Sequence, residues 1–453
     1  MGSLIWSILR DLYVVLLVIF IIEQIPGSDL LHDLTRKGII TVTAGVVAWK
    51  LFGGTLFESS STGGGVQGGP RREKKTEGGT AMGLEWASSE MQGWRQAMED
   101  AVCIVPSLPE PLEQQALFAV FDGHGGAQVS HIASKEFPKV LTACASRLRK
   151  SGEAQEPEKQ DAEESEACTS GEGTDSGCAA AKDPSEDGDR AEKSDECDAE
   201  AHLALKAKGG LSGKSLSMSM LAMDAFLRQL GTGLNSNAAS GGNLAQQTGA
   251  LGVMARHLEA NQQRNAFNLV GSTAIVVLLD NSGPNKKLTV SNCGDSRAVL
   301  CRNGKALELS EDHKPELASE ELRIRQAGGC VKMVGPCHRI DGWGLNLSRA
   351  LGDFHYKARN DLTAEQQKVI AVPEIRSLDL CNDDEFLVLA CDGCFELHTS
   401  QNVIDIVRTA LKSSGMDVKK AAEELVDQSC SPNLMKTRGK GGDNCSCIVV
   451  LLQ

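Results

Sequence analysis

The chain has 453 residues, of which 41% are hydrophobic and only 4% aromatic, so it can bury a large core built mainly from aliphatic side chains. Its net charge of −14 lies in one segment, because residues 151–200 carry 18 acidic and 4 basic side chains and the remainder carries 42 of each. This balance argues against the basic face that nucleic-acid binding requires, and the 15 scattered cysteines, an odd number, favour a reduced intracellular protein.

An apolar N-terminal segment, residues 1–57, differs from the rest of the chain. Residues 12–22 are apolar apart from Tyr13, and a second patch spans residues 39–52. A membrane-spanning helix needs about 20 apolar residues, so a membrane anchor, a cleaved signal peptide and a poorly structured tail all stay open. We favour an anchor with the catalytic part facing the cytosol, because basic residues follow the segment and no small-x-small cleavage site follows Ile22. Cytoplasm or nucleus is the alternative location.

Two further segments have the composition of irregular chain. Residues 58–81 are rich in Gly and Ser with several basic residues, which predicts a flexible linker. The catalytic domain is expected over residues 82–453, interrupted at 150–265 by an acidic insertion that is predicted to be disordered. Within it, Met218–Leu230 has the pattern of a short amphipathic helix, followed by a Gly/Asn/Gln-rich loop. We interpret the insertion as a solvated spacer, with docking of basic partners as the alternative.

Three apolar runs end at an aspartate beside a glycine. They are residues 116–121 before Asp122-Gly123, residues 288–292 before Gly294-Asp295, and residues 385–391 before Asp392-Gly393. Such runs, closed by turn residues, are typical of buried strands, and a helical pattern follows the first over residues 126–148. Carboxylates gathered at buried strand ends repel one another and resist desolvation, and a hard divalent cation removes that cost. The pattern therefore predicts a metal-dependent enzyme.

Residues around the first of these strands could carry the chemistry. Gly123 allows its own carbonyl to approach a metal, and His124 can exchange protons near neutral pH. Upstream, Arg95 offers a planar fork of donors that suits a phosphate, and Glu99 and Asp100 offer oxygen ligands. Taken alone, the segment with Arg95 is more typical of a surface ion-pair cluster, and the glycines are equally consistent with a tight strand-to-helix turn.

Together, the motifs and their order resemble the protein phosphatase 2C family of metal-dependent Ser/Thr protein phosphatases. The resemblance covers about residues 84–148 and 266–452, and the acidic insertion is similar to that of gamma-type members. The motifs that carry it are Arg95-x-x-Met98-Glu99-Asp100, Asp122-Gly123-His124-Gly125-Gly126, Gly271-Ser272-Thr273-Ala274, Gly294-Asp295-Ser296-Arg297, Ser348-Arg349-Ala350-Leu351-Gly352-Asp353, Asp392-Gly393 and Asp443-Asn444.

The resemblance implies a role for each of these residues. Asp122 would bridge two Mn²⁺ or Mg²⁺ ions, with Glu99 and the Gly123 carbonyl completing one shell. The other shell would contain Asp353, Asp392 and Asp443, while Asp295 would bind a third, weaker ion or support the shell, and Asp100 would be a further ligand. A water shared by the ions would attack phosphorus, while Arg95 orients the phosphate and His124 protonates the departing Ser or Thr oxygen. All-oxygen ligands favour Mn²⁺ or Mg²⁺ over zinc.

Some residues depart from the family pattern or have a structural interpretation. Phe395-Glu396 replaces the usual Trp-Asp, which bears on positioning, and His355 stands where an acid is common, which bears on an auxiliary metal. Cys391 and Cys394 match a C-x-x-C motif, but we interpret them as strand-end residues. His313 and His338 are predicted to be surface or flap residues, and residues 319–328 are predicted to form a short helix that packs through Leu322 and Ile324.

The resemblance implies an α+β fold, a four-layer α/β/β/α sandwich with two mainly antiparallel sheets and a binuclear metal site between them. The expected function is hydrolysis of phosphoserine and phosphothreonine in phosphoprotein substrates by a monomeric catalytic unit. Two alternatives stay open, a catalytically inactive membrane-tethered scaffold and a phosphatase that acts on small molecules.

Overall fold

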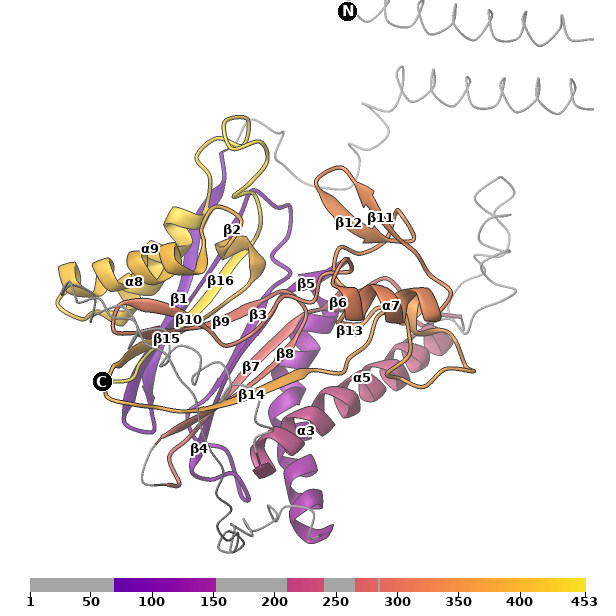
Figure 1. The fold of residues 1–453 in the computed structure, drawn as a ribbon, viewed down its shortest axis with the longest axis horizontal. Helices are drawn as coiled ribbons and strands as arrows, with labels where there is room; N and C mark the ends of the chain where they lie inside the picture. Colours follow the sequence, from indigo (N-terminus) through magenta and orange to yellow (C-terminus); the bar gives the residue numbers. More distant parts are fainter. Residues whose placement is uncertain (1–68, 152–209, 240–264, 284–285) are drawn as a thin grey trace, which may run out of the picture. The chain divides into compact units, whose positions relative to one another are not determined.

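Two antiparallel sheets form the centre of the fold, which the computed structural model describes for residues 69–151, 210–239, 265–283 and 286–453 (Figure 1). The larger sheet has the strand order β1 (Arg71–Ala81), β2 (Leu84–Gly93), β16 (Cys445–Leu451), β15 (Asp384–Ala390), β9 (Arg297–Arg302), β10 (Lys305–Glu308). The smaller has the order β14 (Glu374–Asp379), β8 (Lys287–Cys293), β7 (Ala274–Asp280), β4 (Gln115–Phe121), β3 (Ala101–Val105). The prediction of an α+β protein with mainly antiparallel sheets is confirmed.

Strand β4 shows why an uninterrupted apolar run was the correct signal for a strand here. All seven of its residues are buried. Phe118 and Val120 pack into the core that joins β7 of one sheet to β15 and β16 of the other, whereas Leu117 and Phe121 pack into a second core beneath the helices. Successive side chains of a strand point to opposite faces, so a strand covered on both faces must be apolar at every position.

Helices pack on the outer face of each sheet (Figure 1). Helices α3 (Gln128–Ser151) and α5 (Gly210–Ala239) pack on the five-stranded sheet, and α8 (Ser400–Ser414) and α9 (Val418–Ser429) pack on the six-stranded sheet. Side chains cap α8 and α9 at their N-termini, since Thr399 accepts a hydrogen bond from the Asn402 amide and Asp417 accepts from the amides of residues 419 and 420.

Short elements at one end of the sheets place the residues of the candidate site. β13 (Leu351–Gly352), β6 (Gly271–Ser272) and β5 (Gly123–His124) form a small sheet in that order. The short helices η2 (Phe354–Lys357) and η3 (Asp392–Cys394) follow β13 and β15 directly. Helix α7 (Ala318–Gln326) and the hairpin of β11 (Val331–Val334) and β12 (Cys337–Ile340) form the flap, residues 318–346, above β6 and β13 (Figure 1).

The linker prediction for residues 58–81 is wrong for its last part, because Arg71–Ala81 is strand β1. It pairs with β2 from Arg71↔Gly93 to Ala81↔Leu84, and Lys74 forms a 2.5 Å ion pair with Asp427 of α9. Most of its side chains are exposed, so the strand has little apolar periodicity in the sequence. The folded region therefore begins before Met82.

The insertion contains more structure than expected, whereas the N-terminal prediction lies outside the described residues. Helix α5 spans Gly210–Ala239, so the predicted helix at Met218–Leu230 exists but begins earlier and continues into the first part of the predicted loop, as far as Ala239. Its Leu216, Met220, Met223 and Leu227 are fully buried in the core with α3. Residues 1–68, 152–209 and 240–264 lie outside the description, and among the described residues no helix has the length and hydropathy that crossing a bilayer requires.

Helix α7 confirms the short helix predicted at residues 319–328 but not both of its predicted core contacts. Ile324 is fully buried, whereas Leu322 is 58% exposed. Two residues apart on a helix point to faces roughly 200° apart, so one helix face cannot bury both.

Candidate active site

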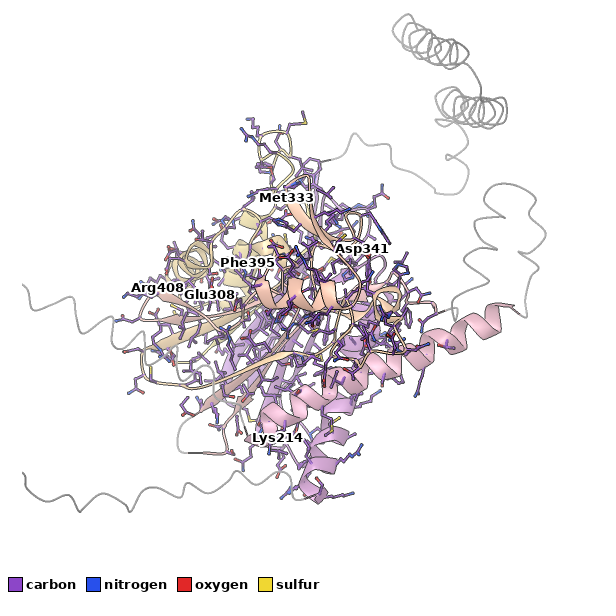
Figure 2. All side chains as sticks on the ribbon, turned by 45° about the vertical axis from the view of Figure 1, so that its right-hand side comes forward. Lys214, Glu308, Met333, Asp341, Phe395 and Arg408 are labelled. Carbon is purple, nitrogen blue, oxygen red and sulfur yellow. The ribbon has the colours of Figure 1, made fainter. Side chains whose placement is uncertain are left out.

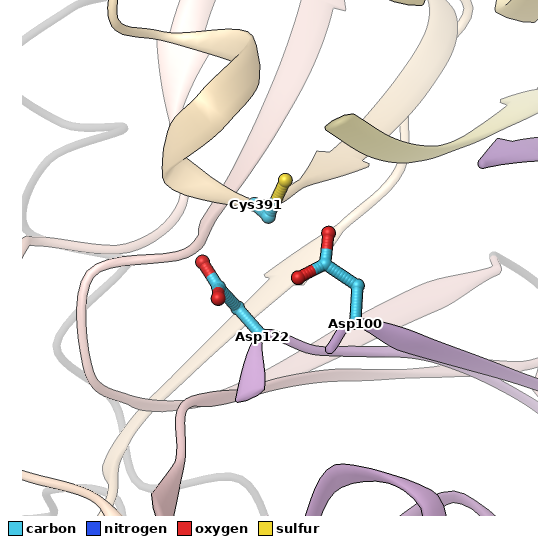
Figure 3. Close-up of side chains that lie close together, drawn as sticks. All are labelled: Asp100, Asp122 and Cys391. Carbon is cyan, nitrogen blue, oxygen red and sulfur yellow. The ribbon is translucent and has the colours of Figure 1, made fainter. Parts of the chain in front are cut away.

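Asp122, Asp100 and Cys391 meet where β4, β3 and β15 come together (Figure 3). Their side-chain ligand atoms all lie within 4.8 Å of one another, and Asp100 also accepts a 2.7 Å hydrogen bond from Ser446 Oγ. Burial and the nearby Asp443 carboxylate raise the pKa of Asp100 to about 7. Burial, followed by repulsion from Asp100 and Asp392, raises the pKa of Asp122 well above its ordinary value. The site therefore lacks the positive charge that would stabilise the ionised form of both carboxylates.

Asp392 and Asp443 extend the same group of carboxylates. Asp392 opens η3 immediately after β15, and burial together with repulsion from Asp295 and Asp443 raises its pKa well above the ordinary range. Asp443 lies before β16 and forms an ion pair with Arg95, yet burial still raises its pKa. Arg95 is 56% exposed, so one side of its guanidinium contacts Asp443 while the rest is open to a ligand.

Asn444 positions the segment that carries Glu99. Its side-chain oxygen accepts a 2.9 Å hydrogen bond from the Glu99 amide, and its side-chain nitrogen donates to the carbonyls of Gln92 and Ala97 at 2.8 and 3.0 Å. The neighbouring position 123 must be glycine, because a Cβ there would collide with the Glu99 carbonyl oxygen. The backbone at Glu99 and Gly123 is thus held side by side, and the ion that the two residues would share stays a prediction.

His124 and Asp353 form a second pair beside the carboxylates. His124 Nε2 lies 2.7 Å from Asp353 Oδ2, and Asp353 is only 1% exposed. Burial lowers the pKa of the His124 imidazole, but the charge and hydrogen bond of Asp353 outweigh it, so the pKa lies above its ordinary value. The other oxygen of this aspartate, Oδ1, is buried and has no hydrogen-bond partner. A cation would satisfy that oxygen.

Asp295 has a partner that the sequence analysis did not identify. Its buried carboxylate forms an ion pair with Lys314, whose pKa is lowered by burial but raised more strongly by Asp295. Lys314 lies 19 residues from Asp295 in the sequence, and no local pattern indicated that they would meet. The predicted third ion at Asp295 stays a prediction, and that carboxylate already has one positive neighbour.

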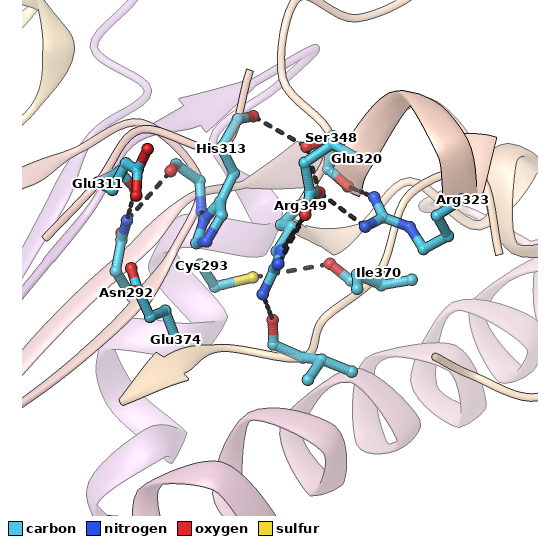
Figure 4. Close-up of polar contacts among 12 residues, drawn as sticks. Asn292, Cys293, Glu311, His313, Glu320, Arg323, Ser348, Arg349, Ile370 and Glu374 are labelled. Atoms are coloured by element: carbon cyan, nitrogen blue, oxygen red, sulfur yellow. Dashed lines mark hydrogen bonds and ion pairs between the residues drawn. The ribbon is translucent and has the colours of Figure 1, made fainter. Parts of the chain in front are cut away.

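A hydrogen-bond network around Glu320 of the flap joins Arg323, Ser348 and Arg349 (Figure 4). The Glu320 carboxylate accepts hydrogen bonds from Arg323 at 2.7 Å, Ser348 Oγ at 2.6 Å and Arg349 at 2.6 Å. Ser348 and Arg349 lie just before Asp353. The Ser348 amide and hydroxyl both donate to the carbonyl of His313, which precedes Lys314.

His313 itself corrects the surface prediction. It is 4% exposed, and its Nδ1 accepts a 3.2 Å hydrogen bond from the Gly294 amide, next to Asp295. Burial and the nearby Arg349 charge lower the pKa of this imidazole to about 3, so it is neutral. Its role is to fix the turn that carries Asp295. His338 lies half-buried in β12, 3.5 Å from Glu316, in agreement with the predicted flap position.

The donor set suits a hard divalent metal ion. Carboxylate oxygens predominate, burial and mutual repulsion raise the pKa values of Asp122 and Asp392, and Asp353 retains an oxygen without a partner. Cys391 is the exception, since its sulfur lies within the cluster. Its sulfur accepts a hydrogen bond from the Ser446 amide at 3.2 Å and lies 3.4 Å from the Asn444 carbonyl. The interaction with Cys394 lowers the pKa of this thiol, but burial and the nearby Asp100 and Asp122 carboxylates raise it more, so the pKa lies well above its ordinary value. The cysteines of the described residues are all free thiols.

Comparison with known proteins agrees with this geometry. The family described as Protein phosphatase 2C matches residues 84–182 and 235–437. Probable protein phosphatase 2C 58 of Oryza sativa subsp. japonica is 31% identical over 396 residues, which cover 84% of this chain and 87% of the relative. Protein phosphatase 1G of Homo sapiens is 42% identical over 185 residues, covering 40% of this chain and 32% of the relative.

A solved structure supports the fold. The crystal structure of a phosphatase from a pathogenic strain of Toxoplasma gondii aligns with a TM-score of 0.53 at 22% identity, and the match covers 84% of this chain and 95% of that one. The family match includes strands of both sheets and the motifs that carry Asp122, Asp295, Asp353 and Asp392. The chain therefore belongs to the protein phosphatase 2C family of serine/threonine protein phosphatases.

Proposed function

We propose that this phosphatase hydrolyses phosphoserine and phosphothreonine in proteins directly, at a binuclear Mn²⁺ or Mg²⁺ centre around Asp122. The observation that carries this proposal is the gathering of carboxylates whose burial and mutual repulsion raise the pKa values of Asp122 and Asp392. The proposed fold is the four-layer α/β/β/α sandwich, with the metal site where β4 and β15 end. The insertion after α3 is gamma-like in this proposal, which the partial match to protein phosphatase 1G supports.

The proposed ligand assignment is the one that the resemblance to the family implies. Asp122 would bridge the two ions, Glu99 and the Gly123 carbonyl would serve one, and Asp353, Asp392 and Asp443 would serve the other. Asp100 and Asp295 would support these shells, Asp295 with the option of a third ion. When bound, the ions supply positive charge to the carboxylates and phosphate and lower the pKa of water so that it can act as the nucleophile.

Arg95 is the proposed phosphate-binding residue. Its guanidinium already contacts Asp443, so it is held at the edge of the carboxylate cluster, and it is more than half exposed. A planar fork of N–H donors matches two oxygens of a phosphate. Arg95 would therefore orient the phosphate while it stays anchored to Asp443.

His124 is the proposed general acid. Hydrolysis breaks the P–O ester bond, water supplies the oxygen that the phosphate gains, and the departing Ser or Thr oxygen must take up a proton. Because Asp353 raises the pKa of His124 and engages its Nε2, the imidazolium is favoured and Nδ1 remains to donate that proton.

The test is Mn²⁺-dependent hydrolysis of a phosphothreonine peptide by the full chain and by its Asp122→Asn variant. The full chain is required, because a shortened protein that begins at Met82 would lack strand β1. We expect activity that depends on the metal and is lost in the variant. Equal activity in both proteins would exclude the mechanism, and no activity in either would favour a catalytically inactive scaffold.

We also propose that residues 1–57 anchor the enzyme to a membrane, with residues 82–453 in the cytosol. Support comes from the two apolar patches at residues 12–22 and 39–52 and from the basic residues that follow them. The expected result is membrane association that resists alkaline carbonate and disappears when residues 1–57 are deleted. Release of the full chain by carbonate would contradict the anchor.

A further inference from the structure

Two large apolar side chains are exposed on segments that adjoin the candidate site. Trp343 follows β12 in the flap and is 62% exposed, and Leu269 precedes β6 and is 56% exposed. His355, the first residue after Phe354 in η2, lies between their segments. We call Leu269, His355 and Trp343 the ledge.

The ledge is built from direct contacts between these segments. The ring of Trp343 lies 5.8 Å from that of His355 and 6.2 Å from that of Tyr356, centroid to centroid, and the His355 and Tyr356 rings pack edge to face at 5.2 Å. The His355 amide donates a 3.0 Å hydrogen bond to the carbonyl of Asn268, the residue before Leu269. The ledge is therefore a fixed surface rather than separate exposed residues.

Two of the three ledge residues, Leu269 and His355, lie on backbone segments that adjoin His124 and Asp353. The Leu269 carbonyl packs against Gly125, which follows His124, so closely that a Cβ at Gly125 would collide with it. His355 lies two residues after Asp353, whose amide donates a 3.0 Å hydrogen bond to the Val270 carbonyl. The exposed apolar side chains thus lie on the side of the site that His124 occupies.

We propose that the ledge binds an apolar side chain of the phosphoprotein, next to the phosphorylated Ser or Thr. This inference rests on the proposed function, in which His124 protonates the departing oxygen. The group that leaves with this proton is the protein substrate itself, so surfaces beside His124 face the peptide, whereas Arg95 contacts the phosphate. We assign the ledge to the substrate chain, because the ledge adjoins the residues that would act on the phosphorylated side chain.

The chemistry of the ledge favours an aliphatic or aromatic residue over a charged one. Indole and leucine surfaces gain from losing contact with water, and they offer no counter-charge to an acidic side chain. Two of the nearby flap charges are already engaged, since Asp341 pairs with Lys368 at 2.8 Å and Arg339 donates to the Gly344 carbonyl at 2.9 Å. Burial of one large apolar side chain corresponds to a preference of about 10- to 100-fold in kcat/KM.

The experiment compares phosphothreonine peptides that differ only in the residue beside the phosphothreonine, which is Leu, Gly or Asp on either side. The full chain with Mn²⁺ is assayed as wild type, Trp343→Ala and Leu269→Ala. Met333→Ala is the matched control, because Met333 has the same 62% exposure as Trp343. It lies on β11, where it pairs with His338 towards the hairpin turn, whereas Trp343 follows Asp341 near the base of the hairpin (Figure 2). The result is the Leu/Gly ratio of kcat/KM within each protein, so that a general loss of activity cancels.

We expect the wild type to prefer the Leu peptide about 10-fold or more on one side of the phosphothreonine, mainly through KM. Trp343→Ala and Leu269→Ala should each bring the ratio close to one, and Met333→Ala should keep the wild-type ratio. A wild type without preference, or a preference that survives both substitutions, would overturn the ledge. Failure of the proposed function looks different, because then no peptide is hydrolysed in a metal-dependent manner.

Sedimentation of the same proteins tests the other occupant, since a dimer that Trp343→Ala dissociates would assign the ledge to a second copy of the chain.

Discussion

Two buried acidic sites in this enzyme have opposite electrostatics. Glu320 is surrounded by donors, and although burial acts to raise its pKa, Arg349, Arg323 and Ser348 outweigh burial and lower it to about 2. Asp122 is surrounded by other carboxylates, and burial and repulsion raise its pKa well above the ordinary value. The first site is neutralised by its own side chains, whereas the second is left with excess negative charge.

The difference separates a structural ion cluster from one that is built for a ligand. Buried charges are tolerated when they are paired and hydrogen-bonded, which the Glu320 network achieves with two arginines. The carboxylates around Asp122 have Arg95 and Lys314 at their margins, each committed to one partner, Asp443 and Asp295. Added cations would complete this site but would have no place at Glu320.

The largest expected effect comes from Asp122→Asn. Loss of a bridging carboxylate should reduce Mn²⁺-dependent kcat/KM by about 1,000-fold or more, since Lewis-acid assistance contributes several kcal/mol to the barrier. The metal-free variant should be at least as stable as the wild type, because one repelling charge is gone. Enzyme kinetics and thermal unfolding in a chelator measure the two effects, and a destabilised metal-free variant would argue that Asp122 is a structural residue.

Glu320→Ala should give the reverse pattern, with stability as the main loss. It leaves Arg323 and Arg349 buried without a counter-charge, which costs about 3–5 kcal/mol of unfolding free energy. Glu321→Ala is the matched control, because the neighbouring Glu321 pairs with exposed Arg325 and should cost about 0.5 kcal/mol or less. Urea unfolding provides both values. Equal effects of the two substitutions would remove the distinction drawn between the two buried acidic sites.

The same contrast predicts how stability depends on pH. The pKa of Asp100 in the folded protein, about 7, lies above its ordinary value of 3.8. Its contribution to the free energy of unfolding is therefore complete below about pH 4 and is lost as the pH rises through 7. The folded pKa of Glu320, about 2, lies below its ordinary 4.5, so its contribution is complete above that value and is lost as the pH falls through 2.

The metal-free enzyme should therefore be less stable at about pH 7.5 than at about pH 5, by on the order of 2 kcal/mol. Added Mn²⁺ should remove this difference, and Asp100→Asn should reduce it. The measurement is chemical denaturation with and without a chelator at the two pH values. A metal-free enzyme that becomes more stable as the pH rises would show that Asp100 is already ionised and compensated.

The parts of the site that could be predicted from sequence were those in which one residue and its immediate neighbours determine the outcome. Asp122 and Asp392 follow apolar runs that had to be buried strands, and the glycines beside them marked sharp turns. The family motifs indicated His124, Arg95 and Asp353, and the structure brings His124 into contact with Asp353 and Arg95 into contact with Asp443. The metal-binding roles stay predictions.

What could not be predicted depends on partners distant in sequence. Strand β1 is an edge strand with exposed side chains, so composition alone made it look like a linker. His313 is surrounded in sequence by charged residues and looks exposed, yet Gly294 and Arg349 enclose it. The Asp295–Lys314 pair is equally hidden, because the two segments meet through backbone hydrogen bonds such as that from the His313 amide to the Gly294 carbonyl.

The smallest of the predicted effects concerns this pair. Lys314→Met would remove the ammonium group that contacts Asp295 and also acts on Asp392. Since that charge repels incoming cations, its loss should lower the Mn²⁺ concentration for half-maximal activity by about 2- to 10-fold, which is the scale of one partly screened charge. Lys368→Met is the control, because Lys368 pairs with Asp341 in the flap and should leave the Mn²⁺ requirement unchanged. If Lys314→Met instead raises the requirement, then Lys314 holds Asp295 in the geometry that cations need, and the positive charge belongs to the site as much as the carboxylates do.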